Sequence, residues 1–397
     1  LMAMVIDRIT AGLAARSGDY DPENKTFAQK HRYWITAAFG AVTFFVLAQI
    51  AGILNEWPQA WEISPAKAMN DGLTYLVVNF RDEIEAVKKF AFFFVMLPAK
   101  IGLQGAVSPF TWGFELTLVH KVVYAVGIVA LALWAAYRGR TQVAILILIL
   151  AILLYFGLTG IPWPALLLIC AVAGWKIGGR VLGLGTALGL GFIVITGIWP
   201  EAMLSIYLCG IAVLISFVLG TAIGIWAAHN DRFSAIIRPF NDTLQTMPLF
   251  VLLIPFVMVF KIGEFTALLA IIAYAIVPAI RYSEHGLRSL PAPVIEAATM
   301  IGSTRRQMLW QVKIPLALPV MMLGLNQTIM YGIAMLVIAA LVGTNGLEQI
   351  VYIGLSDGNF GVGIIAGIGM AIIAIITDRM TNAWSRRRQE ELGLSVA

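Results

Sequence analysis

Long apolar runs alternate with short polar connections along almost the whole chain. Most runs approach the roughly 20 apolar residues that a helix needs to cross a bilayer, which is about twice the length of a barrel strand. The pattern therefore predicts an all-α, polytopic membrane protein with about ten spans. The count stays open within 162–198 and 247–282, where the runs are short. The expected spans lie near residues 33–54, 118–137, 141–158, 162–177, 181–198, 203–228, 247–262, 264–282, 320–342 and 362–383.

Lysine and arginine are concentrated in one alternating set of connections. The other set, around 159–161, 199–202 and 343–361, contains neither residue. Cytoplasmic loops carry the excess of basic residues, so the pattern predicts an even number of spans with both termini in the cytoplasm. The stretch 283–319 is then cytoplasmic as well. The basic connections hold Arg138, Arg140, Lys176, Arg180, Arg232 and Arg238, and the tail holds Arg386, Arg387 and Arg388.

The composition agrees with a lipid environment. Of the 397 residues, 60% are hydrophobic and 12% are charged, with a mean hydropathy of +0.86, whereas soluble domains carry about a quarter charged residues. The net charge of +5 does not indicate nucleic acid, because the basic residues stand at the ends of apolar runs, where anionic lipid attracts them. Cys170 and Cys209 lie within apolar runs, which favours buried hydrophobes over a disulfide.

Residues 1–32 are polar and carry scattered charges, so we expect a cytoplasmic segment there and no cleavable signal peptide. Part of it, VIDRITAGLAAR, places Val5, Ile6, Ile9 and Leu13 near one helical face. That face suits a helix on the membrane surface, and a solvated helix is an equal alternative.

The outer segment 55–117 mixes charged and aromatic residues, with Trp57 and Trp61 early and FRDEIEAVKKFAFFFVMLP later. We expect a helix that rests on or re-enters the outer leaflet and ends at Pro98. An eleventh span is the alternative. Pairs of glycines four residues apart predict close helix packing, and they are Gly185 and Gly189, Gly220 and Gly224, and Gly363 and Gly367.

The loop 283–319 is long, charged and bent. Pro291 and Pro293 suit the start of a helix over VIEAATMI, and Gly302 suits its end. Thr304 and Gln307 form a capping-box pattern that predicts a second short helix. Pro315 and Pro319 then mark the entry to the next span.

The second predicted helix exposes Met308, Leu309 and Trp310 beside charged residues. Such a surface is typical of a docking site for a partner protein. The alternative is an amphipathic loop that lies on lipid headgroups.

The spacing E-A-A, three residues, G, nine residues, then hydrophobic-x-hydrophobic-P resembles the cytoplasmic loop of ABC importer permeases. The resemblance implies a type I permease core whose loop inserts into a cleft of a separate ATPase subunit and transmits its closure. The residues implied in this coupling are Glu296, Ala297, Ala298, Gly302, Arg305, Arg306, Val312, Ile314 and Pro315.

Three further stretches resemble the glycine betaine/proline branch of these permeases. They are IIRPFNDTLQTMPLFVLLIPFVMVFKIG, GLNQTIMYGIAMLVIAALVGTNGLEQIV and IIAIITDRMTNA, and the likeness covers roughly 160–385. Residues 105–158 depart from the shorter members. The expected organisation is a cytoplasmic segment 1–32, N-terminal spans 33–158, a core 159–385 and a cytoplasmic tail 386–397.

The resemblance implies a transport subunit of the bacterial inner membrane and not an enzyme. The cargo would be an osmoprotectant such as glycine betaine, proline betaine, choline, carnitine or trimethylamine N-oxide. Implied partners are an ABC ATPase that binds ATP and magnesium, a periplasmic substrate-binding protein and a second permease copy. The chain has no P-loop motif, and we expect no cofactor of its own.

Polar residues within the span after the loop are candidates for the substrate path. Hydrogen bonding between helices is an equal alternative for them. The candidates are Asn326, Gln327, Thr328, Tyr331 and Met335. Asp378 beside Arg379 is a candidate gate charge, with an ion pair or interfacial anchor as the alternative.

Two other function classes are alternatives to an ABC permease. A secondary transporter driven by an ion gradient predicts carboxylates at mid-span, and the sequence offers essentially none. A membrane enzyme predicts a catalytic cluster, and none stands out. The four histidines lack the spacing of a metal site.

Overall fold

The computed structural model describes residue 10, residues 31–50 and residues 65–391. These residues contain helices and no β-strand, as the all-α prediction requires. The chain divides into two compact units, residues 1–78 and 79–397. The first unit holds α3 (Arg32–Ile50) and most of α4 (Ala66–Asn79). Apart from residue 10, the surface helix predicted over VIDRITAGLAAR lies outside the described residues, as do Trp57 and Trp61.

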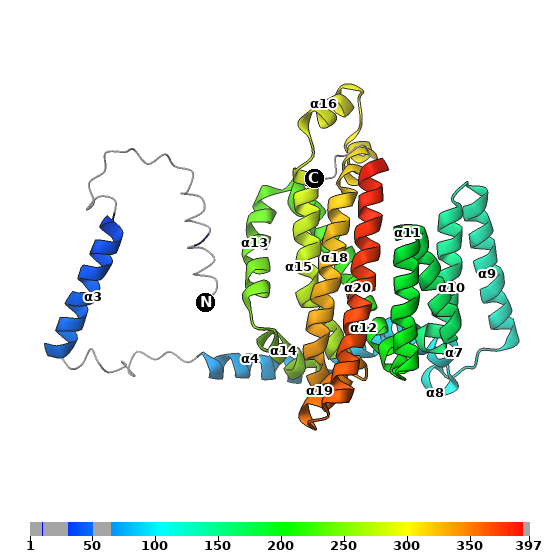
Figure 1. The fold of residues 1–397 in the computed structure, drawn as a ribbon, viewed down its shortest axis with the longest axis horizontal. Helices are drawn as coiled ribbons and strands as arrows, with labels where there is room; N and C mark the ends of the chain where they lie inside the picture. The colour runs from blue at the N-terminus through cyan, green and yellow to red at the C-terminus, as the bar shows by residue number, and fades with distance from the viewer. Residues whose placement is uncertain (1–9, 11–30, 51–64, 392–397) are drawn as a thin grey trace. The chain divides into compact units, whose positions relative to one another are not determined.

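Four long helices form the centre of the second unit. They are α12 (Trp199–His229), α15 (Glu264–Arg288), α18 (Ile314–Ala339) and α20 (Phe360–Glu391), and Figure 1 shows them side by side. Buried apolar side chains from all four join one cluster that includes Met203, Ile271, Met335 and Met370. The spans predicted near 203–228, 264–282, 320–342 and 362–383 correspond to these helices.

Glycines allow α12 and α15 to approach closely. A Cβ atom placed on Gly220 would lie 2.6 Å from the Cβ of Ala279, and one on Gly224 would lie 2.6 Å from the carbonyl oxygen of Ile280. In lipid there is little hydrophobic force between helices, so close contact of this kind supplies much of the attraction. The packing role predicted for this glycine pair is confirmed.

Helix α11 (Trp163–Ile195) folds back on itself at Gly179, whose φ of 83° and ψ of −175° are not helical. A Cβ atom on Gly174 would lie 3.0 Å from the Oγ1 of Thr186. In a straight helix, these positions would be about 18 Å apart along the axis. The two halves are therefore antiparallel neighbours, as the separate runs 162–177 and 181–198 predict.

A helical hairpin lies to one side of this centre (Figure 1). Helices α9 (Leu118–Tyr137) and α10 (Thr141–Gly160) match the runs 118–137 and 141–158 closely. They pack through Ala132, Ala135 and Ala144.

The described residues contain eight helices that are long and apolar enough to cross a membrane, or nine with one bent pair. Helix α11 counts as one helix in this total, whereas the sequence predicts two spans for its two halves. The total is therefore close to the predicted ten.

The bent pair corrects the span predicted at 247–262. Helix α13 (Asp231–Thr246) and α14 (Leu249–Phe260) meet at 101°. The 12 residues of α14 rise only about 18 Å, too little to cross a hydrocarbon core of about 30 Å. Helix α13 was not predicted because Arg232, Arg238 and Asp242 interrupt its apolar pattern.

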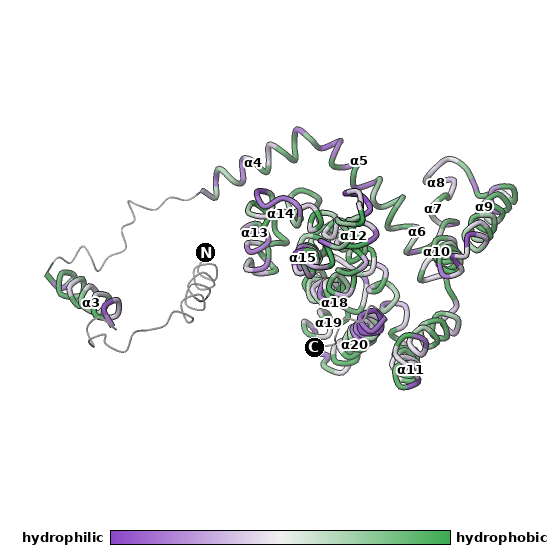
Figure 2. Tube along the Cα trace, turned by 90° about the horizontal axis from the view of Figure 1, so that it is seen from above, coloured by the Kyte–Doolittle hydropathy of each residue, from purple (hydrophilic) through white to green (hydrophobic). Residues whose placement is uncertain are grey.

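The outer segment is one irregular helical path: α5 (Arg81–Ala91), a π-helical turn (Phe92–Met96), α6 (Leu97–Ile101), α7 (Leu103–Ala106) and α8 (Pro109–Trp112). In Figure 2, which looks along the bundle, α5 and α6 run across the view. This supports the surface helix over an eleventh span. The predicted end at Pro98 is wrong, because the helix continues to Gly102, where φ is 85°. A π turn leaves one backbone carbonyl without its usual N–H partner. A proline directly after it has no N–H, so it fits at this position and the helix can continue.

The basic connections share one end of the second unit. Figure 1 places α16 (Ala292–Met300) at the same end as the C-terminal end of α20 and the turn between α9 and α10. The guanidinium of Arg387 donates to the carbonyl oxygen of Lys176, and Arg288 lies 2.7 Å from Asp231. The short helices η5 (Ala340–Val342) and α19 (Leu347–Ser356) lie at the opposite end. This grouping of the basic connections agrees with the charge pattern of the sequence.

We predict that Gly224→Ala destabilises the bundle. The added methyl meets backbone atoms of α15 that cannot rotate away, and overpacking of this kind costs about 1–3 kcal/mol. The matched control is Gly210→Ala on the same helix, where a Cβ atom meets nothing within 4 Å. Thermal unfolding of the purified chain in detergent should give a lower midpoint for the first variant only. Equal midpoints would contradict the close packing.

Candidate functional site

The loop after α15 presents a short helix that stands clear of the bundle. Helix α16 begins after Pro291, with Pro293 in its first turn, as predicted. Gly302 has a φ of +85°. The N–H of Ser303 donates to Ala298 O at 3.2 Å, and the N–H of Gly302 donates to Thr299 O at 2.9 Å. These two bonds are the Schellman arrangement that closes a helix, so Gly302 ends the helix as expected.

The chain then restarts at a capping box. The N–H of Gln307 donates to Thr304 Oγ1 at 3.3 Å, and the N–H of Thr304 donates to Gln307 Oε1 at 3.0 Å. Helix α17 (Arg305–Gln307) follows, then a π-helical turn (Met308–Lys313), and the path runs directly into α18. The predicted start and cap are thus confirmed.

The second helix is not short, which corrects the prediction that Pro315 and Pro319 mark the entry to a separate span. Pro315 lies in the first turn of α18 and Pro319 lies inside it. The π turn directly before Pro315 leaves a carbonyl that the proline has no N–H to satisfy. Pro315 is therefore accommodated in a continuous helix from the loop into the bundle, and Pro319 also lies within this helix.

Helix α16 buries none of its residues. Glu296 and Ala297 are exposed, and Ala298 is half-buried. Met300 is 91% exposed, Ile301 is 86% exposed and Trp310 is 61% exposed. Large apolar side chains at such exposure beside charged residues are typical of a surface that binds a partner protein or lies on lipid headgroups.

The other predicted loop residues divide between this surface and the bundle. Arg305 and Arg306 are exposed on the same loop. Met308 and Leu309, which were predicted to be exposed, are half-buried, since the helix that carries them leads into the bundle. The remaining three are also half-buried, and they are Val312, Ile314 and Pro315.

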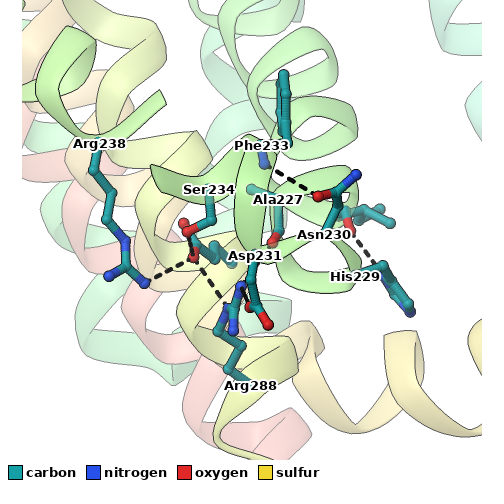
Figure 3. A network of polar contacts seen from close by, with 10 residues as sticks. Ala227, His229, Asn230, Asp231, Phe233, Ser234, Arg238 and Arg288 are labelled. Carbon is teal, nitrogen blue, oxygen red and sulfur yellow. Dashed lines mark hydrogen bonds and ion pairs between the residues drawn. The ribbon is translucent and has the colours of Figure 1, made fainter. Parts of the chain in front are cut away.

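A buried carboxylate, Glu284, lies between α13 and α15, and Figure 3 labels its partners Ser234, Arg238 and Arg288. Glu284, near the end of α15, is 6% exposed. Its Oε1 accepts from Ser234 Oγ at 2.6 Å and lies 3.1 Å from both the Arg238 and Arg288 guanidinium groups. Arg288 also lies 2.7 Å from Asp231 and donates to Ala227 O at 2.8 Å. We call these residues the Glu284 network.

The Glu284 network joins the turn between α12 and α13 to the end of α15. A buried carboxylate is costly unless it is paired and hydrogen-bonded, so its partners fix the relative positions of three helices. This network was not predicted from the sequence. The available signal was Glu284 four residues before Arg288, at the end of a long apolar helix.

The residues proposed for the substrate path have different environments. Asn326 is 5% exposed and its Nδ2 donates to Asp378 Oδ1 at 2.7 Å, so the alternative of hydrogen bonding between helices applies to it. Asp378 also accepts from Asn382 at 3.0 Å. The Oδ1 of Asn326 is buried without a partner.

The other four candidates follow the same helix. Thr328 is fully buried and donates to Gly324 O in its own helix at 2.8 Å. Met335 is fully buried in the core. Gln327 and Tyr331 are half-buried, and the Tyr331 ring stacks on Tyr274 of α15 with centroids 5.0 Å apart. Aromatic and amide groups thus share one partly open side of α18.

A second polar network lies at the opposite end. Lys100 Nζ lies 2.6 Å from Glu264 Oε1, which also accepts from Asn345 at 3.3 Å, and the Tyr207 hydroxyl donates to the same carboxylate. Lys88 donates to Phe260 O at 3.2 Å. These contacts fasten the outer segment to α12, α14 and α15.

Beneath this network, Ser205 Oγ donates to the buried Glu348 carboxylate at 2.6 Å. Ser205 also lines an apolar cavity of about 210 Å³ between α12, α18 and α20. None of the five substrate-path candidates lines that cavity.

Residues 220–390 match the family described as "Binding-protein-dependent transport system inner membrane component". The chain is 40% identical over 229 residues to the glycine betaine/proline betaine permease ProW of Escherichia coli, which covers 58% of this chain and 65% of the relative. It is 40% identical to the glycine betaine permease OpuAB of Bacillus subtilis, in an alignment that covers 57% of this chain and 80% of the relative. It is 28% identical to the trimethylamine N-oxide permease TmoV of Ruegeria pomeroyi, in an alignment that covers 100% of this chain and 52% of the relative. The chain thus spans slightly less than two thirds of ProW.

We predict that Glu284→Ala lowers the unfolding temperature of the purified chain by several degrees, because it leaves Arg288 and Ser234 without their buried acceptor. Glu284→Gln should fall between this variant and the unchanged chain. The control is Glu391→Ala, which removes an exposed ion pair with Arg388; such pairs contribute about 0–1 kcal/mol. An effect of Glu284→Ala no larger than that of the control would show that the network does not hold the helices.

Proposed function

We propose that this chain, which belongs to the family of binding-protein-dependent transport system inner membrane components, is the permease subunit of an ATP-driven importer. The cargo class is a small quaternary or methylated amine. The observation that carries the proposal is the exposed α16, closed at Gly302 and joined through a capped helix to α18. A loop that buries none of its own helix has its surface free for a partner.

The proposed partner at this loop is an ABC ATPase subunit that binds ATP and magnesium. Met300, Ile301 and Trp310 supply the apolar contact, and large aromatic anchors of this kind dominate binding energy at interfaces. Glu296, Arg305 and Arg306 supply charges around it. The basic end of the bundle, from which α16 projects, is then the cytoplasmic face of a bacterial inner membrane, with both termini on that side.

Movement of α16 reaches the bundle along two routes. One is the end of α15, which the Glu284 network ties to α13. The other is the continuous helix into α18. Nucleotide binding would bias a two-state equilibrium between inward- and outward-facing arrangements. The proposed assembly contains two copies of this permease, two ATPase subunits and a periplasmic binding protein that delivers the cargo.

The names of the relatives support the cargo class. They include glycine betaine, proline betaine and trimethylamine N-oxide, and the alignment with the trimethylamine N-oxide relative includes α9 and α10. The stacked Tyr274 and Tyr331 offer aromatic faces, which attract methylated ammonium groups. We propose Gln327 and Tyr331 as the substrate-facing candidates of α18, with Asn326, Thr328 and Met335 shaping the helix behind them.

The proposal predicts uptake that depends on ATP and not on an ion gradient. Proteoliposomes that contain this chain, its ATPase and its binding protein should accumulate labelled glycine betaine or trimethylamine N-oxide when ATP is enclosed. Collapsing the ion gradients with ionophores should leave uptake unchanged. Uptake that persists without ATP and stops with the gradient would favour a secondary transporter instead.

We further predict that Gly302→Pro uncouples ATP hydrolysis from uptake. Proline holds φ near −65°, whereas Gly302 has a φ of +85°, so the substitution must rebuild the turn after α16. The ratio of amine transported to ATP hydrolysed should fall about tenfold or more, which corresponds to at least about 1.4 kcal/mol.

The control for this variant is Gly358→Pro. Gly358 has a φ of +67° at the opposite end of the bundle, and a Cβ atom there meets nothing within 4 Å. It carries the same backbone strain without touching the loop, so its coupling ratio should stay unchanged. A normal coupling ratio for Gly302→Pro would show that the loop does not couple ATP hydrolysis to uptake.

A further inference from the structure

A groove runs between the second half of α11 and the last helix, α20, which lie next to each other in Figure 1. Its volume is about 560 Å³. One end is lined by Arg379, Asn382 and Arg386, and the rest is lined by apolar side chains, glycines and Thr186, whose hydroxyl donates to the carbonyl oxygen of Leu182. We propose that this groove binds an anionic phospholipid, with the phosphate on the two arginines and an acyl chain along the glycine wall.

Two arginines give the polar end of the groove a positive charge. Arg379 and Arg386 are seven residues apart on α20, so they lie on one face of the helix. Both are exposed, and the described part of the chain gives neither an ion-pair partner. Their neighbours are already engaged, since Arg387 donates to Lys176 O and Arg388 pairs with Glu391. A guanidinium group presents a planar fork of N–H donors that fits the oxygens of a phosphate, and these two have no ion-pair partner among the described residues.

Glycines hold the apolar part of the groove open. A Cβ atom on Gly185 would meet nothing within 4 Å, whereas one on Gly189, a turn further, would lie 2.7 Å from Ile372. The groove is therefore open beside Gly185 and narrows at Gly189, one turn further along α11 from the basic end. Ile372, Ile375 and Ile376 form the facing wall, and such a lining suits an acyl chain.

The length of the groove matches one leaflet. Ile372 and Arg386 are 14 positions apart in α20, which is about 21 Å along the helix. Half of a bilayer, headgroups included, is about 20–22 Å thick. The arginines also stand at the basic end of the bundle, where anionic lipid headgroups are attracted by about 1 kcal/mol for each basic residue.

A phospholipid fits better than a second copy of this chain. Another protein would have to bring both an acidic group for the arginines and a long apolar ridge for the glycine wall. A lipid carries both features in one molecule and is present in any membrane that holds this chain.

Native mass spectrometry of the full chain in detergent tests the proposal, with phosphatidylglycerol and phosphatidylcholine as probes. The unchanged chain should retain phosphatidylglycerol preferentially. Arg379→Gln with Arg386→Gln should lower its apparent affinity for phosphatidylglycerol by about fivefold per arginine and leave phosphatidylcholine unaffected. The charge control is Arg140→Gln, which removes an exposed basic residue at the same end.

A second pair of variants tests the apolar part without changing charge. Gly185→Leu fills the open section of the groove and should also lower retention of phosphatidylglycerol. Gly191→Leu is the control, because Gly191 lies in the same half of α11, has open space around its Cβ position and does not line the groove. Leucine favours helix over glycine, so neither change should weaken the fold.

Two results would overturn the proposal. One is equal retention of the two lipids by the unchanged chain and by all variants. The other is loss of a dimer mass in Gly185→Leu with lipid retention unchanged, which would assign the groove to a second copy of the chain.

Discussion

The Glu284 carboxylate is held away from bulk water where α12, α13 and α15 meet, and that constraint organises the basic end of the bundle. A charge in this position requires compensation from its neighbours. Ser234 and Arg238 reach it from α13, and Arg288 reaches it along α15. Asp242 pairs with Arg281 at 2.5 Å, further along the same two helices. Helix α13, too polar to cross lipid alone, is thus anchored along its length to the most buried helix of the bundle.

Two π-helical turns show a second regularity. One lies directly before Leu97 and Pro98 in the outer segment, and the other lies directly before Ile314 and Pro315 in the loop. Sequence reasoning treats each proline as a boundary, because a proline in an ordinary helix loses a hydrogen bond and crowds the preceding turn. A π-helical turn lowers that cost. It already leaves one carbonyl before the proline without a hydrogen-bond partner, so the missing N–H of the proline removes no further bond. The two helices therefore continue where the sequence suggests a stop.

Local signals account for what the sequence could predict. The ends of α16 follow from Pro291 and Gly302, and the restart follows from Thr304 and Gln307, each within a few residues. Most spans follow from their apolar runs. The contacts of Glu284 with Arg238 and of Lys100 with Glu264 join residues 46 and 164 positions apart. No periodicity encodes such pairs, so the contacts between helices in the two networks could not be predicted. Only the spacing of Glu284 and Arg288 along one helix gave a local signal. Helix α13 was missed for a related reason, because its polar residues have partners only in the folded bundle.

The loop geometry restricts how a force on α16 can spread. Helix α16 buries no residue against the bundle, so its two connections transmit any displacement. One leads to α15 and the Glu284 network, and the other leads through the capped helix to α18. Helices α15 and α18 themselves pack closely, since a Cβ atom on Gly324 would lie 2.6 Å from the Cβ of Tyr282. The two routes therefore converge on one tightly packed pair. At the far end of α15, Glu264 binds Lys100 of the outer segment, so the helix that receives the displacement at the basic end also holds the surface helix at the opposite end.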